Sequence, residues 1–408
     1  MNWKKLPYRE IKNRVFEALG NNLNYQNEQI LGLPATYLDQ EQFYFNAPFL
    51  KDAPFLSVMI HNPNHIGCHT YSSGESYFKG THQIEIDLIR ICAEEIFNAE
   101  AGGYDGYVAP GGSEANIQAQ WIYRNYFMKE KGAKQDEIGL FFSEDVHYSA
   151  YKGCNLLSIK PVCIKVDENR AWDLNDLEQQ LIEVKKRGIK YPIIHLSMGT
   201  TMFGSIDSAD AILAVFEKHF EDFFCHVDAA FGGFIYPFTA TEDDSLSFAN
   251  SKVHSITIDG HKMLQAPYGT GIFLCRKGLM EYSKTEEASY VQGTDFTLCG
   301  SRSGANAVAV WMILMTHGSE GWKYKMQHLI DRTDRICDKL DELDIEYYRN
   351  PDMNIVTIKA EQIPASLAHK FHLVADNFND PKWWKIVTMS HVEKHVVDDF
   401  LIDLQKSI

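Results

Sequence analysis

Residues 255–271, SITIDGHKMLQAPYGTG, combine a short strand-like stretch with the polar sequence Asp259-Gly260-His261-Lys262 and a loop that contains Pro and Gly. A lysine at the end of a buried strand is costly unless its ammonium group is paired or chemically altered. Desolvation lowers the pKa of a lysine and makes it a nucleophile toward carbonyl groups. One interpretation of Lys262 is therefore a lysine that forms a Schiff base, and the other is a surface lysine in a strand-to-loop turn.

The strand in this stretch belongs to a series of short apolar runs that alternate with helical stretches. The runs that we interpret as strands cover residues 104–109, 138–143, 162–166, 192–197, 223–228, 253–258 and 271–275. Most of them are continuously apolar, which is typical of parallel strands covered on both faces. Helices are expected between them, for example at 113–130 and at 176–187, the second capped by Asn175. The alternation predicts an α/β domain around a mostly parallel seven-stranded sheet.

Beyond residue 305 the pattern changes to that of a small α+β domain. An apolar helix at 305–318 and an amphipathic helix at 319–343 are expected first, and a last helix begins near His391. Short strands are expected between them at 345–350, 354–360 and 371–376. We therefore predict an N-terminal segment 1–55, a large domain 56–309 and a small domain 310–408, which the N-terminal segment completes.

Composition excludes several classes of function. The 408 residues are 45% hydrophobic and 23% charged, with a net charge of −16, so affinity for nucleic acid or an anionic membrane is not expected. The N-terminus reads as an amphipathic helix without an apolar signal segment, so we expect neither secretion nor membrane insertion. The eight cysteines are scattered and form no C-x-x-C pair, which favours reduced thiols in the cytoplasm.

Small and hydroxyl residues follow two of the expected strands. In APGGSEANIQAQ, Gly111 and Gly112 let the backbone approach a ligand closely, and Ser113 begins a helix whose N–H groups and dipole attract phosphate. The alternative is a tight turn in which Ser113 is the N-cap. Thr200 and Thr201 follow the strand at 192–197, where their hydroxyls meet an anion or cap a turn.

An acid and a histidine follow two other strands. Asp228, in HVDAAFGG, fits a carboxylate paired with a cationic group beside a flat ligand resting on Ala230, or else it caps the next turn. His147 stacks on an aromatic ring or is a structural histidine. Because ligands of such sheets bind outside the carboxyl ends of the strands, all these groups are expected at one edge together with Lys262.

Pyridoxal phosphate is one cofactor that needs this whole set of groups. Its phosphate takes the helix N-terminus and the hydroxyls, and its aldehyde takes Lys262. Its pyridinium nitrogen pairs with Asp228, whose pKa should be lowered by the opposite charge. Its ring then lies between His147 and Ala230, and protonation of the ring nitrogen makes the ring an electron sink. The Schiff-base interpretation of Lys262 is therefore preferred.

The same motifs carry a resemblance to a known family. The segments GYVAPGGSEANIQA, HYSAYKG, SMGTT, HVDAAFGG, DGHKM and TLCGSRSGANAVAVW resemble those of the pyridoxal-phosphate-dependent group II amino-acid decarboxylases. Within that family the chain is most similar to short bacterial histidine decarboxylases and their relatives, and the resemblance covers about residues 60 to 315. It implies the aspartate-aminotransferase-type fold (fold type I) and a homodimer whose subunits share the active site. The motifs are specific for the family and only weakly specific for the substrate.

The resemblance implies a role for each matching residue. Lys262 would form the Schiff base, Asp228 would hold the ring nitrogen, and His147 and Ala230 would lie on the two faces of the ring. The residues implied around the phosphate are Gly112, Ser113, Thr201 and His261, together with Ser301 from the partner subunit. Tyr290 matches the family's mobile-loop tyrosine, a catalytic residue.

The chain departs from the pattern of its short relatives at one position. Those relatives often have Ser-Gly-His-Lys where this chain has Asp259-Gly260-His261-Lys262. A carboxylate near the phosphate is unfavourable, so we expect Asp259 to point elsewhere.

The segment HNPNHIGCH, residues 61–69, raises the possibility of a metal site. Pro63 breaks a helical arrangement of its histidines, and no further ligand set is evident, so no metal is expected. The resemblance instead makes this segment a loop at the substrate entrance, where any of His61, His65 and His69 could meet the substrate.

The implied reaction is decarboxylation of an L-amino acid to the amine and CO2. Histidine is the first substrate expected, with aspartate, serine and aromatic amino acids as alternatives. Other uses of the fold are a transaminase, a carbon–carbon lyase acting on a phosphorylated amine, an aldehyde-forming decarboxylase, or a silent scaffold that binds cofactor. Either Tyr290 or His147 is expected to protonate the substrate carbon after CO2 leaves.

Overall fold

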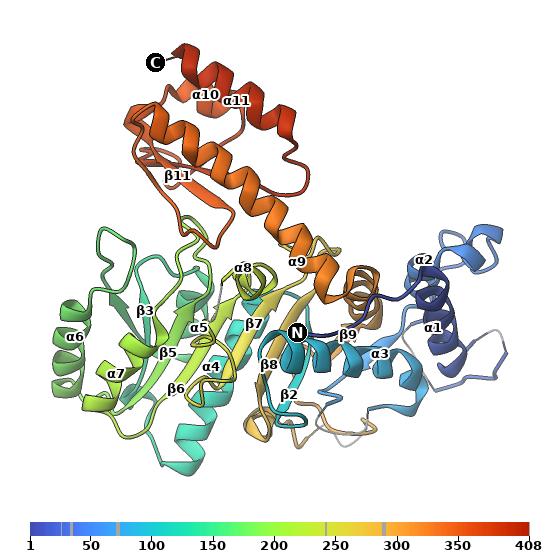
Figure 1. Cartoon of the computed structure of the whole chain (residues 1–408). Coiled ribbons are helices and arrows are strands. Elements are labelled where there is room, and N and C mark those ends of the chain that lie inside the picture. The colour runs from blue at the N-terminus through green and yellow to red at the C-terminus, as the bar shows by residue number, and fades with distance from the viewer. Residues whose placement is uncertain (26, 33–35, 71–73, 241–242, 288–290, 408) are drawn as a thin grey trace.

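The computed structural model describes residues 1–25, 27–32, 36–70, 74–240, 243–287 and 291–407, and Figure 1 shows the whole chain. Its helices are α1 Tyr8–Asn21, α2 Pro54–His61, α3 Lys79–Arg90, α4 Gly112–Glu130, α5 Ser149–Leu157, α6 Leu174–Lys186, α7 Ala209–His219, α8 Tyr236–Thr239, α9 Gly304–Glu342, α10 Ala365–Lys370 and α11 Lys394–Ser407. Its strands are β1 Asn64–Ile66, β2 Tyr104–Ala109, β3 Ile138–Ser143, β4 Lys160–Ile164, β5 Tyr191–Ser197, β6 Phe224–Ala229, β7 Ser255–Asp259, β8 Gly271–Arg276, β9 Ser301–Ser303, β10 Tyr347–Tyr348, β11 Ile355–Lys359, β12 Val374–Ala375 and β13 Trp383–Val387.

A seven-stranded sheet forms the centre of the larger part of the molecule. Its order is β2-β8-β7-β6-β5-β3-β4, and every pair from β4 to β7 is parallel. Strand β8 runs antiparallel to both neighbours. Eleven residues, 260–270, connect β7 to β8, which is too short for the helical crossover that a parallel pair requires. The expected α/β fold with a mostly parallel seven-stranded sheet is confirmed.

The continuous apolar runs form strands because both faces of this sheet are covered. Every residue of β2, β3, β6 and β7 is buried. Successive side chains point to opposite faces, so Leu140 and Phe142 join one core with α4 and α5, whereas Phe141 joins the other core with α6 and α7. Two hydrophobic layers therefore hold the strand ends in fixed positions.

A four-stranded antiparallel sheet, ordered β10-β11-β13-β12, forms a smaller unit with the second half of α9, α10 and α11. Figure 1 shows this unit, coloured orange and red, at one end of the molecule. Helix α9 is interrupted at Gly318, whose φ of 66° is non-helical, so the two expected helices are joined at that residue. Strand β13 was not among the strands expected from the sequence, and most of its residues are only partly buried.

The N-terminal segment packs differently from the expectation. Helix α1 contacts α2, α3 and α9, and Figure 1 places it, in dark blue, far from the small sheet. Trp3 and Leu6 bond to the backbone of α9 on either side of its interruption, through Trp3 O with Ser319 N and Leu6 N with Met315 O. The segment thus contacts residues 314–319, inside the predicted range of the small domain, but it adds no residue to the core of the four-stranded sheet. Within the described residues, none of the helices is long and apolar enough to cross a membrane.

The helix α6 also begins differently from the expectation. Asp173 is the N-cap, and its carboxylate accepts hydrogen bonds from the backbone N–H groups of Asn175 and Asp176. Asn175 lies inside the first turn. The cap is thus two residues before the predicted one, a shift within the usual error of helix boundaries.

The first prediction concerns the contact between α1 and α3. A Cβ atom on Gly80 would lie 1.9 Å from the carbonyl oxygen of Ala18. Gly80→Ala must push the two helices apart, and we expect it to lower the free energy of unfolding by about 1–3 kcal/mol. Urea unfolding followed by circular dichroism measures the change.

The matched control for this prediction is Gly20→Ala in α1. A Cβ atom there meets nothing within 4 Å among the described residues, so this variant should be neutral or slightly more stable because alanine favours helices. Equal stabilities for the two variants would contradict the tight packing of α1 against α3.

Candidate functional site

A cavity of about 440 Å³ opens at the carboxyl ends of β2, β6 and β7. Its lining includes seven of the residues singled out from the sequence, namely Gly112, Ser113, His147, Asp228, Ala230, His261 and Lys262. These residues come from four separate segments that the parallel sheet brings to one edge. Pro110, Gly111, Glu114, Asn116, Tyr148 and Asp259 complete the lining.

The amino end of α4 forms one wall of the cavity. Gly111 and Gly112 lead from β2 into the helix, and a Cβ atom on Gly112 would lie 2.8 Å from Asp259 Oδ2. A side chain at this position would therefore have to displace the Asp259 carboxylate. The exposed N–H groups and dipole of a helix start attract an anion, so this wall suits a phosphate group.

Lys262 and Asp259 lie together on the adjoining wall. Lys262 Nζ is 3.2 Å from Asp259 Oδ2, and His261 Nε2 is 3.6 Å from the same oxygen. The lysine side chain is one-third exposed, toward the cavity that it lines, whereas the Asp259 carboxylate is buried. The expectation that Asp259 points elsewhere is wrong, because its carboxylate lines the cavity and pairs with the ammonium of Lys262.

Asp228 lies at the end of β6 with its carboxylate buried. Ala230 N donates to Oδ1 at 3.0 Å and Asn116 Nδ2 donates to Oδ2 at 2.7 Å, while His195 Nε2 lies 3.6 Å from Oδ2. Burial alone would raise the pKa of this carboxyl group. The neighbouring His195, the ammonium of Lys262 and the Ala230 N–H outweigh burial and hold the pKa of Asp228 below its ordinary value. The carboxylate is therefore an anion that can pair with a cation in the cavity.

His147 follows β3 and lies over the cavity with Tyr148 beside it. The centroids of the two rings are 4.1 Å apart. Burial lowers the pKa of His147, and the positive charge of Lys262 acts in the same direction, so the imidazole is neutral at pH 7. A neutral ring suits stacking on another aromatic ring. Tyr148 was not singled out from the sequence, and its position directly after His147 was the available signal.

Two residues expected around the phosphate do not line the cavity of the single chain. Ser301 is exposed in β9, which pairs with β1. Thr201 is exposed, and its carbonyl oxygen accepts a hydrogen bond of 2.8 Å from Lys385 of the small unit. Burial and the nearby charge of Lys262 lower the pKa of Lys385. The loop that carries Thr201 is thus tied to the small unit.

The same loop is held to the small unit by an aromatic contact. Phe203 packs edge-on against Tyr348 and Trp383, with ring centroids 5.9 and 5.6 Å apart. The guanidinium group of Arg170 lies on the Phe203 ring, 3.8 Å from its centroid. The position of the small unit therefore sets the position of the backbone around Thr201.

The histidines at 61–69 lie apart from the cavity lining. His65 and His69 are buried, and His65 bonds to Glu85 at 2.8 Å and to Thr81 at 2.9 Å. His61 bonds through Nδ1 to the carbonyl oxygen of Ser57 at 2.7 Å. The structure of the single chain thus buries His65 and His69 beside Glu85, apart from the residues that line the cavity.

This cluster gains His82 from α3, so that His65, His69 and His82 each bring a ring nitrogen within 4.8 Å of the others. Both nitrogens of His65 are already bonded. The rings of His69 and His82 are stacked, with an angle of 21° between their planes. A metal site built on the three histidines would therefore require His65 to release one of its hydrogen bonds.

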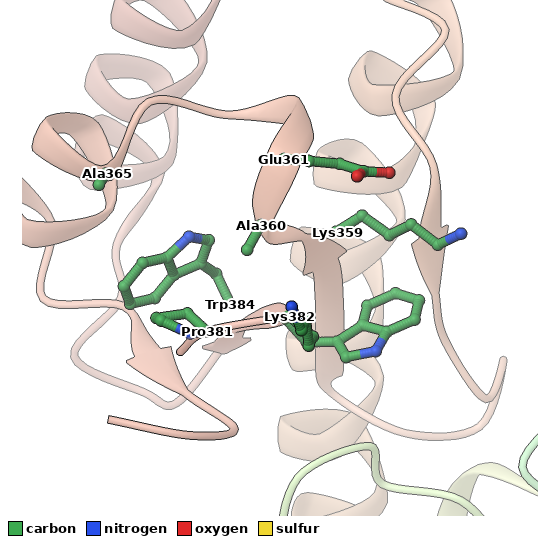
Figure 2. Close-up of a pocket in the computed structure, with 8 residues that line it drawn as sticks. Lys359, Ala360, Glu361, Ala365, Pro381, Lys382 and Trp384 are labelled. Carbon is green, nitrogen blue, oxygen red and sulfur yellow. The ribbon is translucent and has the colours of Figure 1, made fainter. Parts of the chain in front are cut away.

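A second cavity of about 460 Å³ lies in the small unit, and Figure 2 shows its lining of lysines and tryptophans. Lys359 is paired with Glu346 at 2.6 Å and Lys382 with Asp380 at 3.1 Å. This cavity lies away from the edge of the seven-stranded sheet. Among its lining residues, neither lysine lies beside buried carboxylates as Lys262 does. Of the two cavities, only the one at the sheet edge fits pyridoxal phosphate: it has a helix start for the phosphate, a lysine for the aldehyde and an ionised carboxylate for the ring nitrogen.

Comparison with known sequences agrees with this geometry. A family model described as "Pyridoxal-dependent decarboxylase conserved domain" matches residues 85–359. Tryptophan decarboxylase of Clostridium sporogenes is 46% identical over 406 residues, which cover 99% of this chain and 97% of that protein. Histidine decarboxylase of Vibrio campbellii is 29% identical, with 88% and 89% of the two chains covered. A probable L-tyrosine/L-aspartate decarboxylase of Methanosarcina barkeri is 30% identical, with 81% and 84% covered.

Solved structures share the fold. L-methionine decarboxylase of Streptomyces sp. 590 has a TM-score of 0.71 at 20% identity, and 98% of this chain and 93% of that chain are covered. A sphingosine-1-phosphate lyase of Burkholderia pseudomallei has a TM-score of 0.70 at 18% identity, with 81% and 77% covered. Because these two structures carry names for different reactions, the fold alone does not decide the reaction.

The second prediction concerns Glu114, an acid that the sequence analysis did not single out. Burial raises the pKa of Glu114 to about 7, although the hydrogen bonds that it accepts from Tyr107 Oη and Cys299 N act in the opposite direction. A carboxyl group whose pKa is raised by folding adds stability at pH values below about 4.5 and loses that contribution as the pH rises through about 7. Wild type should therefore lose stability over this range, and the glutamine variant should not. The difference in melting temperature, Glu114→Gln minus wild type, should increase by about 2–4 °C or more between about pH 5 and pH 8.

Glu130→Gln, at the exposed end of the same helix, is the control and should show no such trend. A temperature difference between Glu114→Gln and wild type that stays constant over this pH range would contradict the raised pKa.

Proposed function

Because the chain belongs to the pyridoxal-dependent decarboxylase family and is a pyridoxal-phosphate-dependent amino-acid decarboxylase, we propose that its substrate is an aromatic L-amino acid, with tryptophan as the first candidate. The observation that carries this proposal is the 46% identity to a tryptophan decarboxylase over nearly the whole chain. The similarity to histidine decarboxylase is much lower, at 29%, so histidine is no longer the preferred substrate.

The charges of the cavity support a substrate without an acidic side chain. Among the described residues that line it, Lys262 is the only lysine or arginine, whereas Glu114, Asp228 and Asp259 are acids. A second carboxylate on the substrate would be repelled there and would find no cationic partner besides the catalytic lysine. An aromatic side chain carries no such penalty and can pack on Tyr148, whose ring is exposed at the cavity.

The proposed roles of the residues are those that the family resemblance implies, and the cavity lining includes most of these residues. When bound, pyridoxal phosphate supplies the electron sink that takes up the charge left at Cα as CO2 departs. Lys262 Nζ would hold its aldehyde covalently, and Asp228 would keep its ring nitrogen protonated. His147 and Ala230 hold the two faces of its ring. The amino end of α4, with Gly112 and Ser113, holds its phosphate together with Thr201 and His261.

Two proposals extend beyond the single chain and its described part. Tyr290, proposed to deliver a proton to Cα, lies outside the described residues, and His147 is the alternative donor. Ser301 is proposed to reach the phosphate of a second copy of the chain, in a homodimer that shares its active sites. Its exposure in β9 is consistent with a role in such an interface. We further propose that the enzyme acts in the cytoplasm, as expected from cysteines that are scattered along the sequence and form no C-x-x-C motif.

The third prediction tests the lysine. Lys262→Ala should lose the visible absorbance of the covalently held cofactor and reduce turnover by about 10³-fold or more, because the covalent link can no longer form. Absorbance spectra of the purified protein with added cofactor, and release of CO2, measure the two effects.

Lys152→Ala is the control for this prediction, since Lys152 is exposed on α5 beside Tyr148 and should retain both properties. Turnover close to wild type in Lys262→Ala would refute the proposed site.

The fourth prediction tests the substrate. Wild-type enzyme loaded with pyridoxal phosphate is incubated separately with tryptophan, phenylalanine, tyrosine, histidine, aspartate and serine, and the amine is identified by mass spectrometry. We expect kcat/KM to be highest for tryptophan and at least about tenfold lower for histidine and aspartate, which corresponds to about 1.4 kcal/mol of transition-state binding. A higher kcat/KM for histidine or aspartate would overturn the proposed specificity.

A further inference from the structure

Asn116 connects the two groups that are proposed to hold the cofactor ring. It lies in the second turn of α4, is 1% exposed and lines the floor of the cavity. We propose that Asn116 is a positioning residue for the reaction: its amide group fixes the Asp228 carboxylate and, through Ser149, the ring of His147. The inference rests on the roles proposed above for Asp228 and His147.

The amide group of Asn116 makes three hydrogen bonds with buried partners. Its Nδ2 atom donates to Asp228 Oδ2 at 2.7 Å and to Ser149 Oγ at 3.0 Å. Its Oδ1 atom accepts from His226 Nε2 at 2.9 Å. His226 and Asp228 are two residues apart on β6 and therefore point to the same face of the sheet, toward α4. One amide group on the helix can thus bond to both.

The direction of these bonds is determined by their partners. An ionised carboxylate only accepts hydrogen bonds, so the atom of Asn116 that faces Asp228 must be the nitrogen. If the Asn116 amide were rotated by 180°, its Oδ1 atom would contact Asp228 Oδ2, and both atoms are acceptors. The buried carboxylate would then lack this donor. Both hydrogens of Nδ2 are then used, one by Asp228 and one by Ser149.

The orientation of His147 follows from Ser149. The backbone N–H of Ser149 donates to His147 Nδ1 at 3.3 Å, and Ser149 Oγ lies 2.9 Å from the same nitrogen. Because a backbone N–H only donates, Nδ1 is an acceptor and the neutral ring carries its proton on Nε2. Ser149 therefore donates its hydroxyl hydrogen to His147 and accepts from Asn116, so the amide indirectly fixes the tautomer of His147.

The other end of the network keeps the amide in place. His226 donates from Nε2 to Asn116, with Thr257 Oγ1 3.3 Å from the same nitrogen, and its Nδ1 accepts from Ser255 Oγ at 2.7 Å. Ser255 in turn bonds to Tyr123. Burial lowers the pKa of His226, which keeps the imidazole neutral as this pattern requires. Each group therefore donates a hydrogen bond to the next, from Tyr123 through Ser255 and His226 to Asn116. Asn116 then donates to Asp228 and, through Ser149, orients His147.

Two substitutions separate the donor role of Asn116 from the space that it fills. Asn116→Ala removes the donor and leaves a gap, whereas Asn116→Asp keeps the shape and replaces the donor by an acceptor beside Asp228. We expect Asn116→Asp to bind pyridoxal phosphate at least about tenfold more weakly than wild type and to lower kcat about 10-fold to 100-fold, with KM changed less than threefold. The visible absorbance band of the Lys262-bound cofactor should also shift. Asn116→Ala should have equal or smaller effects.

The measurements are the dissociation constant of pyridoxal phosphate by absorbance titration, steady-state kinetics and the melting temperature of the protein without added cofactor. Gln120→Ala, a fully buried position one turn further along α4, is the matched control and should keep the cofactor affinity of wild type. A role limited to filling space would leave Asn116→Asp near wild type and Asn116→Ala more damaged, and that result would overturn the inference.

Failure of the inference is distinguishable from failure of the proposed function. If wild-type protein and Gln120→Ala bind cofactor and release CO2 while Asn116→Asp does so equally well, only the role of Asn116 is refuted. If wild-type protein releases no CO2 from any of the amino acids tested, the proposed function is refuted, and the role of Asn116 in ordering the site is then decided by cofactor affinity alone.

Discussion

A carboxylate that is kept ionised at a buried position, Asp228 at the end of β6, is the constraint on which the rest of the site depends. A buried anion is costly unless donors and a positive charge compensate for its lost hydration. Here the donors are the backbone N–H of Ala230 and the amide of Asn116, and the nearby cation is Lys262. Removing one donor leaves the anion poorly compensated, so these side chains hold the strand end and the helix in a fixed relation.

The second constraint is the close approach of α4 to β7. A Cβ atom on Gly112 would crowd the Asp259 carboxylate, because the amino end of the helix lies against the segment that carries Lys262. A helix start, a lysine and two carboxylates consequently share one small cavity. The charges in that cavity are mixed, which favours a ligand with both a phosphate and a protonated ring nitrogen over a simple anion.

Much of the fold could be predicted because its signals are local. The seven apolar runs became the seven strands of the sheet, with ends shifted by at most a few residues, since strands buried on both faces need continuous apolar sequence. The features that the sequence did not predict are those whose position depends on packing against a distant segment of the chain. Strand β13 lies in the middle of the small sheet with Lys385 directed to the Thr201 carbonyl, and the N-terminal segment packs on α3 and α9 rather than on that sheet.

By itself the sequence determined the chemistry available at the sheet edge, because residues that follow parallel strands must meet there: Lys262, Asp228, His147 and the Gly111-Gly112-Ser113 turn. Only the tertiary structure decided which other residues join them. Asn116 and Glu114 are ordinary helix residues in sequence, yet the crossing of α4 over the sheet brings both to the cavity, and Asp259, which was expected to point away, lines it from the end of β7. The same structure moved His65 and His69 into a buried cluster, because their partners Glu85 and His82 lie on α3, beyond the reach of any local pattern.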